Sequence, residues 1–297
     1  MLRKMSAVGA AKGDTVLCAP EFLARLALPG GQPWSPREGL LLALAALREH
    51  SRVDYGAEPE LIASRLIPMR DEFDYETVYI PVAYLKTLFG VRQSARVVAL
   101  AKSAQQLRYM RGRESVTAFV GVDGPLKSTE DDQAYVCVSV AGALAVAAHP
   151  SSSRRKAIVV DLDVCRCMRS RMGLFLYLKA RGIVGRGVID GLDRWHGRRT
   201  KTGYAITAAC SRLDEALGID RSLLPKSMAL VERDVLLPAQ ADLAEADYAL
   251  GWSWRVKGRA RMAIDIEFAK LDPRPISVAS SGMCDIDDSN RAPRQAM

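Results

Sequence analysis

Hydrophobic residues recur at intervals of three and four positions along much of the chain, and this spacing predicts helices. The clearest helix start is Ser35-Pro36-Arg37-Glu38, where Ser35 can cap the helix and Glu38 completes a capping box. Proline suits the first helical position because its missing N–H is not needed there. The buried stripe that follows consists of Leu40, Leu41, Leu44 and Leu47.

Further elements are predicted in the first half of the chain. Residues 79–90 predict a short extended, strand-like segment followed by a short helix. Ser94 can cap the next helix, whose apolar stripe continues to about Met110. Two strands are then expected at 116–122 and 135–140, with a turn-rich connection between them.

The second half predicts a similar series. One helix is expected over 162–181, where Gly182 would end it, and a second helix ends at Gly218. After a short turn, a long amphipathic helix begins near Met228. Two strands follow within 248–268, since their apolar residues occupy every second position.

Both halves therefore predict a helix, a turn, a second helix and a β-hairpin, which is typical of a winged helix-turn-helix that reads DNA. The expected fold is α+β, with two tandem winged helix-turn-helix domains that are mostly helical and carry small β-hairpin wings. The polar, basic run 151–156 marks the domain boundary, although a solvated loop inside one domain is the alternative. The expected ranges are a flexible N-terminus at 1–18, a first domain at 19–150, a second domain at 157–271 and a disordered tail at 272–297.

Three segments carry a resemblance to a known family. They are Arg233–Leu243, Trp252-Ser-Trp-Arg-Val-Lys-Gly-Arg259 and Ile264-Asp-Ile-Glu-Phe268. Together they resemble the C-terminal signature of iteron-binding (theta-type) plasmid replication initiators, in which an RVL-x-PA-x-x-EI helix precedes a KKGR turn and an I-x-F strand. The stretch Arg169–Lys179 is similar to the helix that opens the second winged domain of this family.

The resemblance implies tandem winged helices that bind directly repeated origin sites in double-stranded DNA. It also implies opening of an adjacent AT-rich segment, recruitment of the host initiator and replicative helicase, monomer–dimer self-association through the first domain, and autorepression. The chain departs from the family at Glu232 and Asp234, where basic residues are usual. It also has Asp242-Leu243 in place of the EI pair and Ala244 in place of asparagine.

The charge distribution suits a polyanionic partner. Lys and Arg number 42 against 34 Asp and Glu, giving a formal net charge of +8, for which simple solubility is the alternative explanation. The segment from Arg166 to Lys201 is more informative, because it holds ten basic residues and only two acidic ones, Asp190 and Asp193.

Candidate DNA contacts lie where a recognition helix begins and where a wing turns, because these parts of winged helices approach bases and phosphates. For each candidate, the alternative is an ordinary solvated side chain. The first domain offers Arg92, Gln93, Ser94 and Arg96 at the helix start and Lys102 further along. The second offers Lys226, Ser227, Leu230 and Arg233 on the helix, Arg255, Lys257, Arg259 and Arg261 on the hairpin, and Arg198 and Arg199 in the basic segment. Trp252 and Trp254 are expected to pack in the core and not to stack on bases.

No enzymatic site is expected. The three histidines and six cysteines form no metal-binding or disulfide pattern, and there is no phosphate-binding Gly-Lys-Ser/Thr loop. Asp161 is expected to cap a helix and not to bind a metal. No catalytic residue, metal or cofactor is therefore predicted, and no segment predicts a membrane span. The expected location is cytoplasmic, with the bacterial nucleoid or plasmid DNA.

The leading hypothesis is a sequence-specific initiator of plasmid replication. A winged-helix transcriptional repressor without a replication role is the alternative, and a nuclease or relaxase is a third possibility. Several direct repeats beside an AT-rich stretch in the neighbouring DNA would favour the initiator, whereas a single inverted repeat would favour the repressor.

Overall fold

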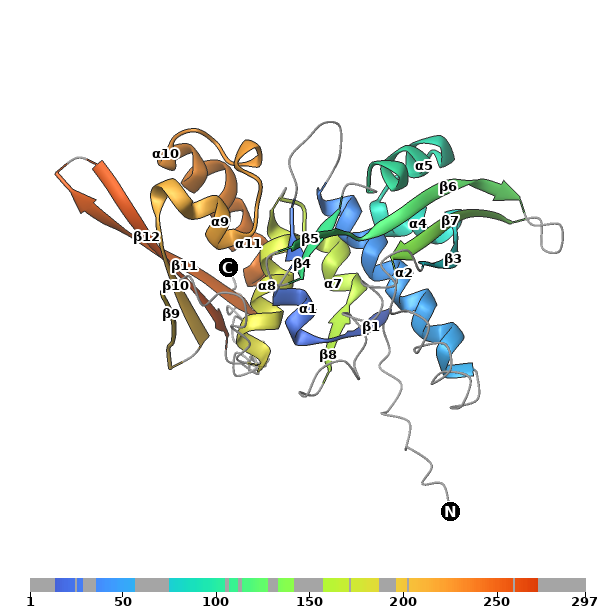
Figure 1. Cartoon of the computed structure of the whole chain (residues 1–297), viewed down its shortest axis with the longest axis horizontal. Coiled ribbons are helices and arrows are strands. Elements are labelled where there is room, and N and C mark those ends of the chain that lie inside the picture. Colours follow the sequence, from blue (N-terminus) through green and yellow to red (C-terminus); the bar gives the residue numbers. More distant parts are fainter. Residues whose placement is uncertain are drawn as a thin grey trace, which may run out of the picture.

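The computed structural model describes residues 14–24, 26–28, 36–56, 75–104, 107–111, 114–127, 133–141, 157–170, 172–186, 196–201, 203–258 and 260–271. In these residues helices combine with small antiparallel sheets, so the fold is mixed α+β (Figure 1). None of the described helices is long and apolar enough to cross a membrane.

From Pro36 onwards, the described residues of the first half combine helices with a three-stranded sheet. The helices are α2 (Pro36–Gly56), α4 (Val82–Phe89) and α5 (Ser94–Ser103). The strands lie in the order β3 (Tyr75–Pro81), β7 (Ala134–Ala141) and β6 (Phe119–Lys127). A separate small sheet consists of β2 (Leu26–Ala27), β4 (Arg108–Arg111) and β5 (Glu114–Thr117).

Two predicted elements of this half are corrected. The helix expected to reach Met110 ends at Ser103, because residues 108–111 pair with β5 and β2 instead. The single strand expected at 116–122 is divided at the buried Ala118 into the end of β5 and the start of β6.

The second half also combines helices with an antiparallel sheet. Its strands lie in the order β11 (Tyr248–Lys257), β12 (Ala260–Lys270), β10 (Gly203–Ala209) and β9 (His196–Arg199). Its helices include α8 (Gly173–Arg186) and α9 (Leu213–Leu217), with short 3-10 turns at Cys210–Arg212 and Arg221–Leu223. The long helix that follows consists of α10 (Met228–Val231), the π-helical turn η5 (Glu232–Leu236) and α11 (Leu237–Glu245).

The helix expected over 162–181 is in fact two helices. The first, α7 (Leu162–Cys167), is capped by Asp161, whose carboxylate accepts hydrogen bonds from the Asp163 and Val164 N–H groups. The predicted capping role of Asp161 is therefore confirmed. Gly182 does not end the second helix, α8, but is buried within it, so tertiary packing outweighs the local preference of glycine.

The two halves repeat one order of elements. In the first half, α2, β3, α4 and α5 are followed by β6 and β7, and in the second half α8, β10, α9 and the long helix are followed by β11 and β12. In the first-half sheet, the last strand, β7, lies between β3 and β6. In the second-half sheet, the last strand, β12, likewise lies between β10 and β11. The alternation of apolar residues explains the burial of one sheet face, as Ile264, Ile266 and Phe268 are at most 1% exposed.

The long helix of the second half widens at η5, a feature that the sequence pattern did not predict. The Leu237 N–H donates to the Glu232 carbonyl, five residues earlier. Pro238 has no N–H to donate to the carbonyl four residues before it, and its ring would crowd that carbonyl in a regular α-helix. The wider turn accommodates this proline without ending the helix.

The N-terminal segment joins the two halves. Strand β1 (Thr15–Cys18) pairs with β8 (Ile158–Asp161), and helix α1 (Pro20–Ala24) packs against α8. Leu28 exchanges backbone hydrogen bonds with Gly218 and Asp220. Residues 14–18 were expected to be flexible, and the buried Val16 and Cys18 explain why they instead form a strand. Residues 1–13, 151–156 and 272–297 lie outside the described residues.

Candidate nucleic-acid interface

Helix α5 presents the first group of candidate residues. Val97, Val98 and Ala101 are buried on one side of the helix. The other side is exposed and carries all five candidates of this half, Arg92, Gln93, Ser94, Arg96 and Lys102.

The start of α5 differs from the prediction. Ser94 was expected to cap the helix, but the capping position belongs to Gln93, whose backbone is extended and whose side chain makes no capping hydrogen bond. Ser94 is the first helical residue, so its side chain lies where it can meet a ligand at the helix start. The helix therefore begins with polar side chains that do not cap its own N–H groups.

The sequence segment that contains α5 has basic residues and no acidic ones. Residues 81–104 contain Lys86, Arg92, Arg96 and Lys102 and no acidic residue. Ala95 and Ala99 are exposed between these cations. Small side chains on a helix let its backbone approach a partner closely, and the cations on either side favour a partner with negative charge.

The long helix of the second half begins differently. The Ser227 hydroxyl accepts a hydrogen bond from the Leu230 N–H at 3.2 Å, so Ser227 caps α10. Lys226 is exposed beside it. Arg233 is also exposed, but its guanidinium binds both carboxylate oxygens of Asp234, at 2.6 and 3.0 Å. This pairing partly neutralises the one cation within the helix.

Glu232 connects this helix to the β11–β12 hairpin. Its carboxylate accepts hydrogen bonds from the indole N–H groups of Trp252 at 3.3 Å and Trp254 at 3.1 Å. Arg261 donates to the same carboxylate at 2.7 Å and also to the Met228 carbonyl at 3.2 Å. The Arg261 guanidinium lies 4.4 Å from the centre of the Trp254 ring. We call these four residues, Glu232, Trp252, Trp254 and Arg261, the helix–wing cluster.

The helix–wing cluster accounts for the unusual carboxylate at position 232. Desolvation tends to raise the pKa of Glu232. The hydrogen bonds from Trp252, Arg261 and Trp254 and the positive charge of Arg261 have the opposite effect and outweigh it, so the pKa is lowered. Both tryptophans are partly buried against the core, as expected. The indole N–H groups of both rings are directed to Glu232, and Arg261 is held towards the helix.

The opposite face of the hairpin carries a second ion pair, between Arg255 and Asp265. Arg255 binds both carboxylate oxygens of Asp265, at 2.9 and 3.0 Å, and Thr207 donates to the same carboxylate. The hydrogen bond from Arg255 is the main reason why the pKa of Asp265 is lowered, and the charge of Arg198 contributes. Arg255 is 61% exposed in spite of this pair, so it can still reach a ligand.

The remaining candidates lie at the rim of the same sheet. Lys257 is exposed at the hairpin turn beside Gly258, whose φ of 62° suits glycine. Lys257 forms no salt bridge with any other residue that the structure describes. Arg198 and Arg199 are exposed on the edge strand β9. Arg259 lies outside the described residues.

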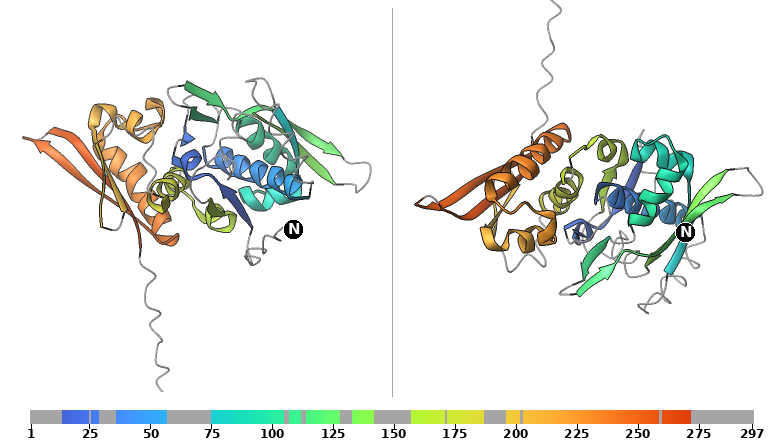
Figure 2. Two further views of the ribbon diagram at one scale, coloured as in Figure 1. Left: turned by 60° about the horizontal axis from the view of Figure 1, so that its bottom comes forward. Right: turned by 90° about the horizontal axis from the view of Figure 1, so that it is seen from above.

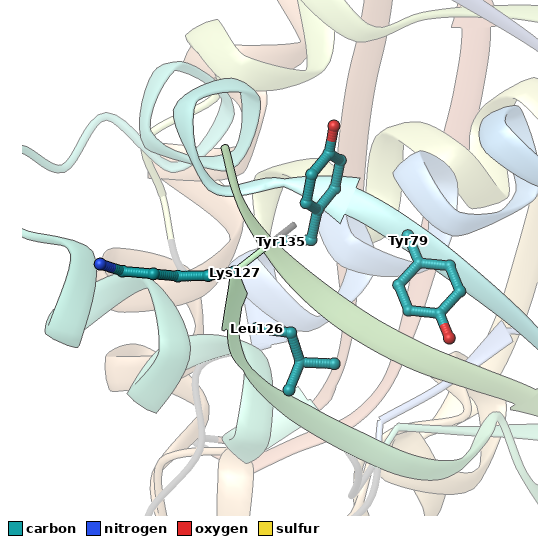
Figure 3. A pocket seen from close by; sticks show the side chains of 4 residues that line it. All are labelled: Tyr79, Leu126, Lys127 and Tyr135. Carbon is teal, nitrogen blue, oxygen red and sulfur yellow. The ribbon is translucent and has the colours of Figure 1, made fainter. Parts of the chain in front are cut away.

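One surface hollow lies on the first-half sheet. It has a volume of about 480 Å³ and is lined by Tyr79, Leu126, Lys127 and Tyr135 (Figure 3). Figure 3 shows the two tyrosine rings pointing away from each other, so the polar groups do not converge on one point. Within the described residues, no group of three or more His, Cys, Asp or Glu side chains could hold a metal ion.

Comparison with known proteins finds similarity in structure and not in sequence. No protein-family model matches the chain, and no curated protein is similar to it in sequence. Among solved structures, the chain is similar to one described as the crystal structure of Pi initiator protein in complex with iteron DNA. The similarity covers 89% of this chain and 100% of that chain, with 15% sequence identity and a TM-score of 0.44. The proposed function rests on this chain's own residues.

Proposed function

We propose that the protein is a sequence-specific DNA-binding protein with two tandem winged helix-turn-helix domains, and that it initiates plasmid replication. The observation that carries the DNA-binding proposal is the repeated order of elements, in which each half ends with a helix followed by a hairpin. Winged helices use this second helix to enter the major groove and the hairpin to reach the neighbouring backbone or minor groove.

In the first domain, α5 is the proposed recognition helix. Arg92 and Arg96 can each pair with guanine, and Gln93 can pair with adenine, through two hydrogen bonds in the major groove. Lys102, two turns further along, suits a phosphate contact. The absence of acidic residues from 81–104 supports this role, because a carboxylate near the helix would repel the DNA backbone.

In the second domain, α10 and η5 form the proposed recognition helix and β11–β12 the wing. The wing extends well beyond the helices in Figure 1, with Lys257 near its tip. Lys257, Arg255, Arg198 and Arg199 are exposed on this sheet and suit phosphates or a narrow minor groove. Arg261 contributes by fixing the wing through the helix–wing cluster, and Arg259 completes the proposed basic turn.

The arrangement of the two domains supports binding to one face of a DNA duplex. In Figure 1, α5 and α10 both lie along the upper side of the molecule, and the two hairpins extend to opposite ends. The views in Figure 2 agree with an elongated arrangement that has a hairpin at each end. Two helices on one side can enter successive major grooves, which lie about 34 Å apart on B-DNA.

The initiator role is the more specific part of the proposal and rests on the sequence resemblance. It includes direct repeats as the binding site, opening of AT-rich DNA, contact with the host initiator and helicase, and dimerisation through the first domain. We propose no catalytic step and a location with plasmid DNA. The alternative is a repressor with the same DNA-binding domains.

The test is binding of the full chain to a labelled fragment of the DNA that flanks its gene. Scrambled DNA serves as competitor, and the measurement is repeated over a series of salt concentrations. Stepwise complexes on direct repeats that resist the competitor are expected, with affinity falling by about 0.9 log units per log unit of salt for each neutralised phosphate. Equal binding to scrambled DNA would refute sequence recognition, and one complex on an inverted repeat would favour the repressor.

Matched variants connect this binding to the proposed surface. Lys257→Ala removes a cation at the wing tip, whereas Lys270→Ala removes an exposed cation at the other end of the same sheet. The two positions are roughly 30 Å apart along the hairpin, given the rise of a β-strand. Lys257→Ala should weaken binding and Lys270→Ala should not. Equal effects would show that general charge, and not the wing, controls binding.

A further inference from the structure

The start of the second recognition helix has an unusual exposed surface. Ala229 and Leu230 lie in its first turn, and Ala229 is exposed while Leu230 is 36% exposed. Leu237, further along the helix, is 48% exposed. Counted from the capping residue of each helix, Leu230 takes the position that Arg96 has in α5, and Ala229 takes the position of Ala95.

The polar groups of the same helix are already engaged. The Ser227 hydroxyl caps α10, Glu232 belongs to the helix–wing cluster, and Arg233 is bound by Asp234. Lys226, just before the helix, is an exposed cation. The first turn of the helix therefore presents the apolar side chains of Ala229 and Leu230 to a partner, and the paired Arg233 and Asp234 are exposed in the next turn.

The occupant of this surface follows from the charges around it. Lys226 lies at one end of the helix, and Lys257 is exposed at the tip of the wing. Cations at the rim of an apolar helix start fit a duplex whose phosphates meet the rim and whose base edges meet the helix. The apolar group on base edges in the major groove is the C5 methyl of thymine, which alanine and other apolar side chains contact.

We propose that Ala229 and Leu230 are specificity-determining residues that recognise thymine methyl groups in the half of the site bound by the second domain. This inference rests on the proposed DNA-binding function and makes it more specific. The two domains then read DNA by different means. Helix α5 uses hydrogen bonds to guanine and adenine, whereas α10 uses apolar contacts that select A·T pairs at fixed positions.

The test removes single methyl groups from DNA. The full chain first selects its preferred duplex from a randomised pool, and each thymine of that duplex is then replaced in turn by deoxyuridine. Deoxyuridine keeps base pairing and hydrogen-bonding groups and lacks only the methyl group. Replacement at one or two positions in one half of the site should weaken binding about fourfold each, the effect of exposing one buried methyl group.

Variants assign the effect to residues. Leu230→Ala should abolish the preference for thymine over deoxyuridine at one position, and the partial exposure of Leu230 makes this truncation compatible with folding. Lys226→Ala is the matched control at the same helix end. It should weaken binding to both duplexes equally and leave the thymine preference unchanged.

The outcomes separate this inference from the proposed function. Selection of a defined duplex with no effect of any deoxyuridine would overturn the inference while sequence-specific binding stands. A thymine preference that persists in both Leu230→Ala and Ala229→Gly would overturn the assignment to these residues. Failure to select any duplex would refute the proposed function, and the thymine-reading inference with it.

Discussion

Lys179 is buried where α8 meets the N-terminal helix α1, and its replacement by methionine has a pH-dependent effect on stability that can be predicted. The side chain is 5% exposed, and its ammonium group donates to the Ala24 carbonyl at 3.1 Å. The Phe175 ring centre lies 5.1 Å from the same nitrogen. Burial lowers the pKa of Lys179 from 10.5 to about 7.

The size and sign of the effect follow from this pKa. A decrease from 10.5 to about 7 corresponds to a cost of about 5 kcal/mol for keeping a charged lysine in the fold. Between these values the unfolded chain binds more protons than the folded chain at this site. The Lys179 contribution to the free energy of unfolding therefore rises by about 1.4 kcal/mol per pH unit above pH 7, and the cost is complete below pH 7.

Urea unfolding of the wild type and Lys179→Met at several pH values measures this contribution. The variant should be the more stable protein at pH 6–7, and its advantage should shrink steadily towards pH 10. Comparison of the two proteins is needed because burial raises the pKa of Cys18 to about 12, which lowers stability above pH 9 in both. Lys270→Met, at an exposed site, serves as the control and should show no such trend.

An advantage of Lys179→Met that stays constant from pH 6 to pH 10 would refute the reasoning. It would mean that the lysine remains charged over the whole range, with the Ala24 carbonyl and the Phe175 ring compensating for lost hydration. A variant less stable than the wild type at pH 6 would also contradict it, since the hydrogen bond would then outweigh the cost of burying the charge.

Three further changes have defined outcomes. Glu232→Ala leaves the donors of the helix–wing cluster without their shared acceptor, so the free energy of unfolding should fall by about 2 kcal/mol in urea titration, and an unchanged value would contradict the cluster's role. Gly203→Ala places a methyl carbon 1.9 Å from the Phe268 carbonyl oxygen, so a loss of about 2 kcal/mol or more is expected in the same assay, and wild-type stability would show that β10 can shift freely. Lys257→Ala should reduce the slope of log affinity against log salt by about 0.9, and an unaltered slope would remove this side chain from the phosphate contacts.

Local patterns predicted the elements that depend on neighbouring residues in sequence. The alternation of Ile264, Ile266 and Phe268 predicted the last strand, and the structure confirms the hairpin that it forms with β11. The cap at Asp161 was predicted for the same reason, because the groups that it binds are two and three residues away.

Features that depend on distant parts of the chain could not be predicted in this way. Strand β1 is stable because it pairs with β8, more than a hundred residues later, and no local pattern specifies that pairing. Serine is a common capping residue, yet the capping position of α5 belongs to Gln93, whose backbone is extended, and Ser94 is the first helical residue. Glu232 was identified only as a departure from the family pattern, since its partners Trp252 and Arg261 lie on two different strands.

The proposed function is tested most directly by a hydroxyl-radical footprint of the full chain on the DNA that flanks its gene. Two tandem winged helices on one face of DNA predict, in each direct repeat, two protected blocks about one helical turn apart. Replacement of Arg92 and Arg96 by alanine should remove one block and leave the other. Absence of protection, or protection equal to that on scrambled DNA, would contradict sequence-specific binding by two domains.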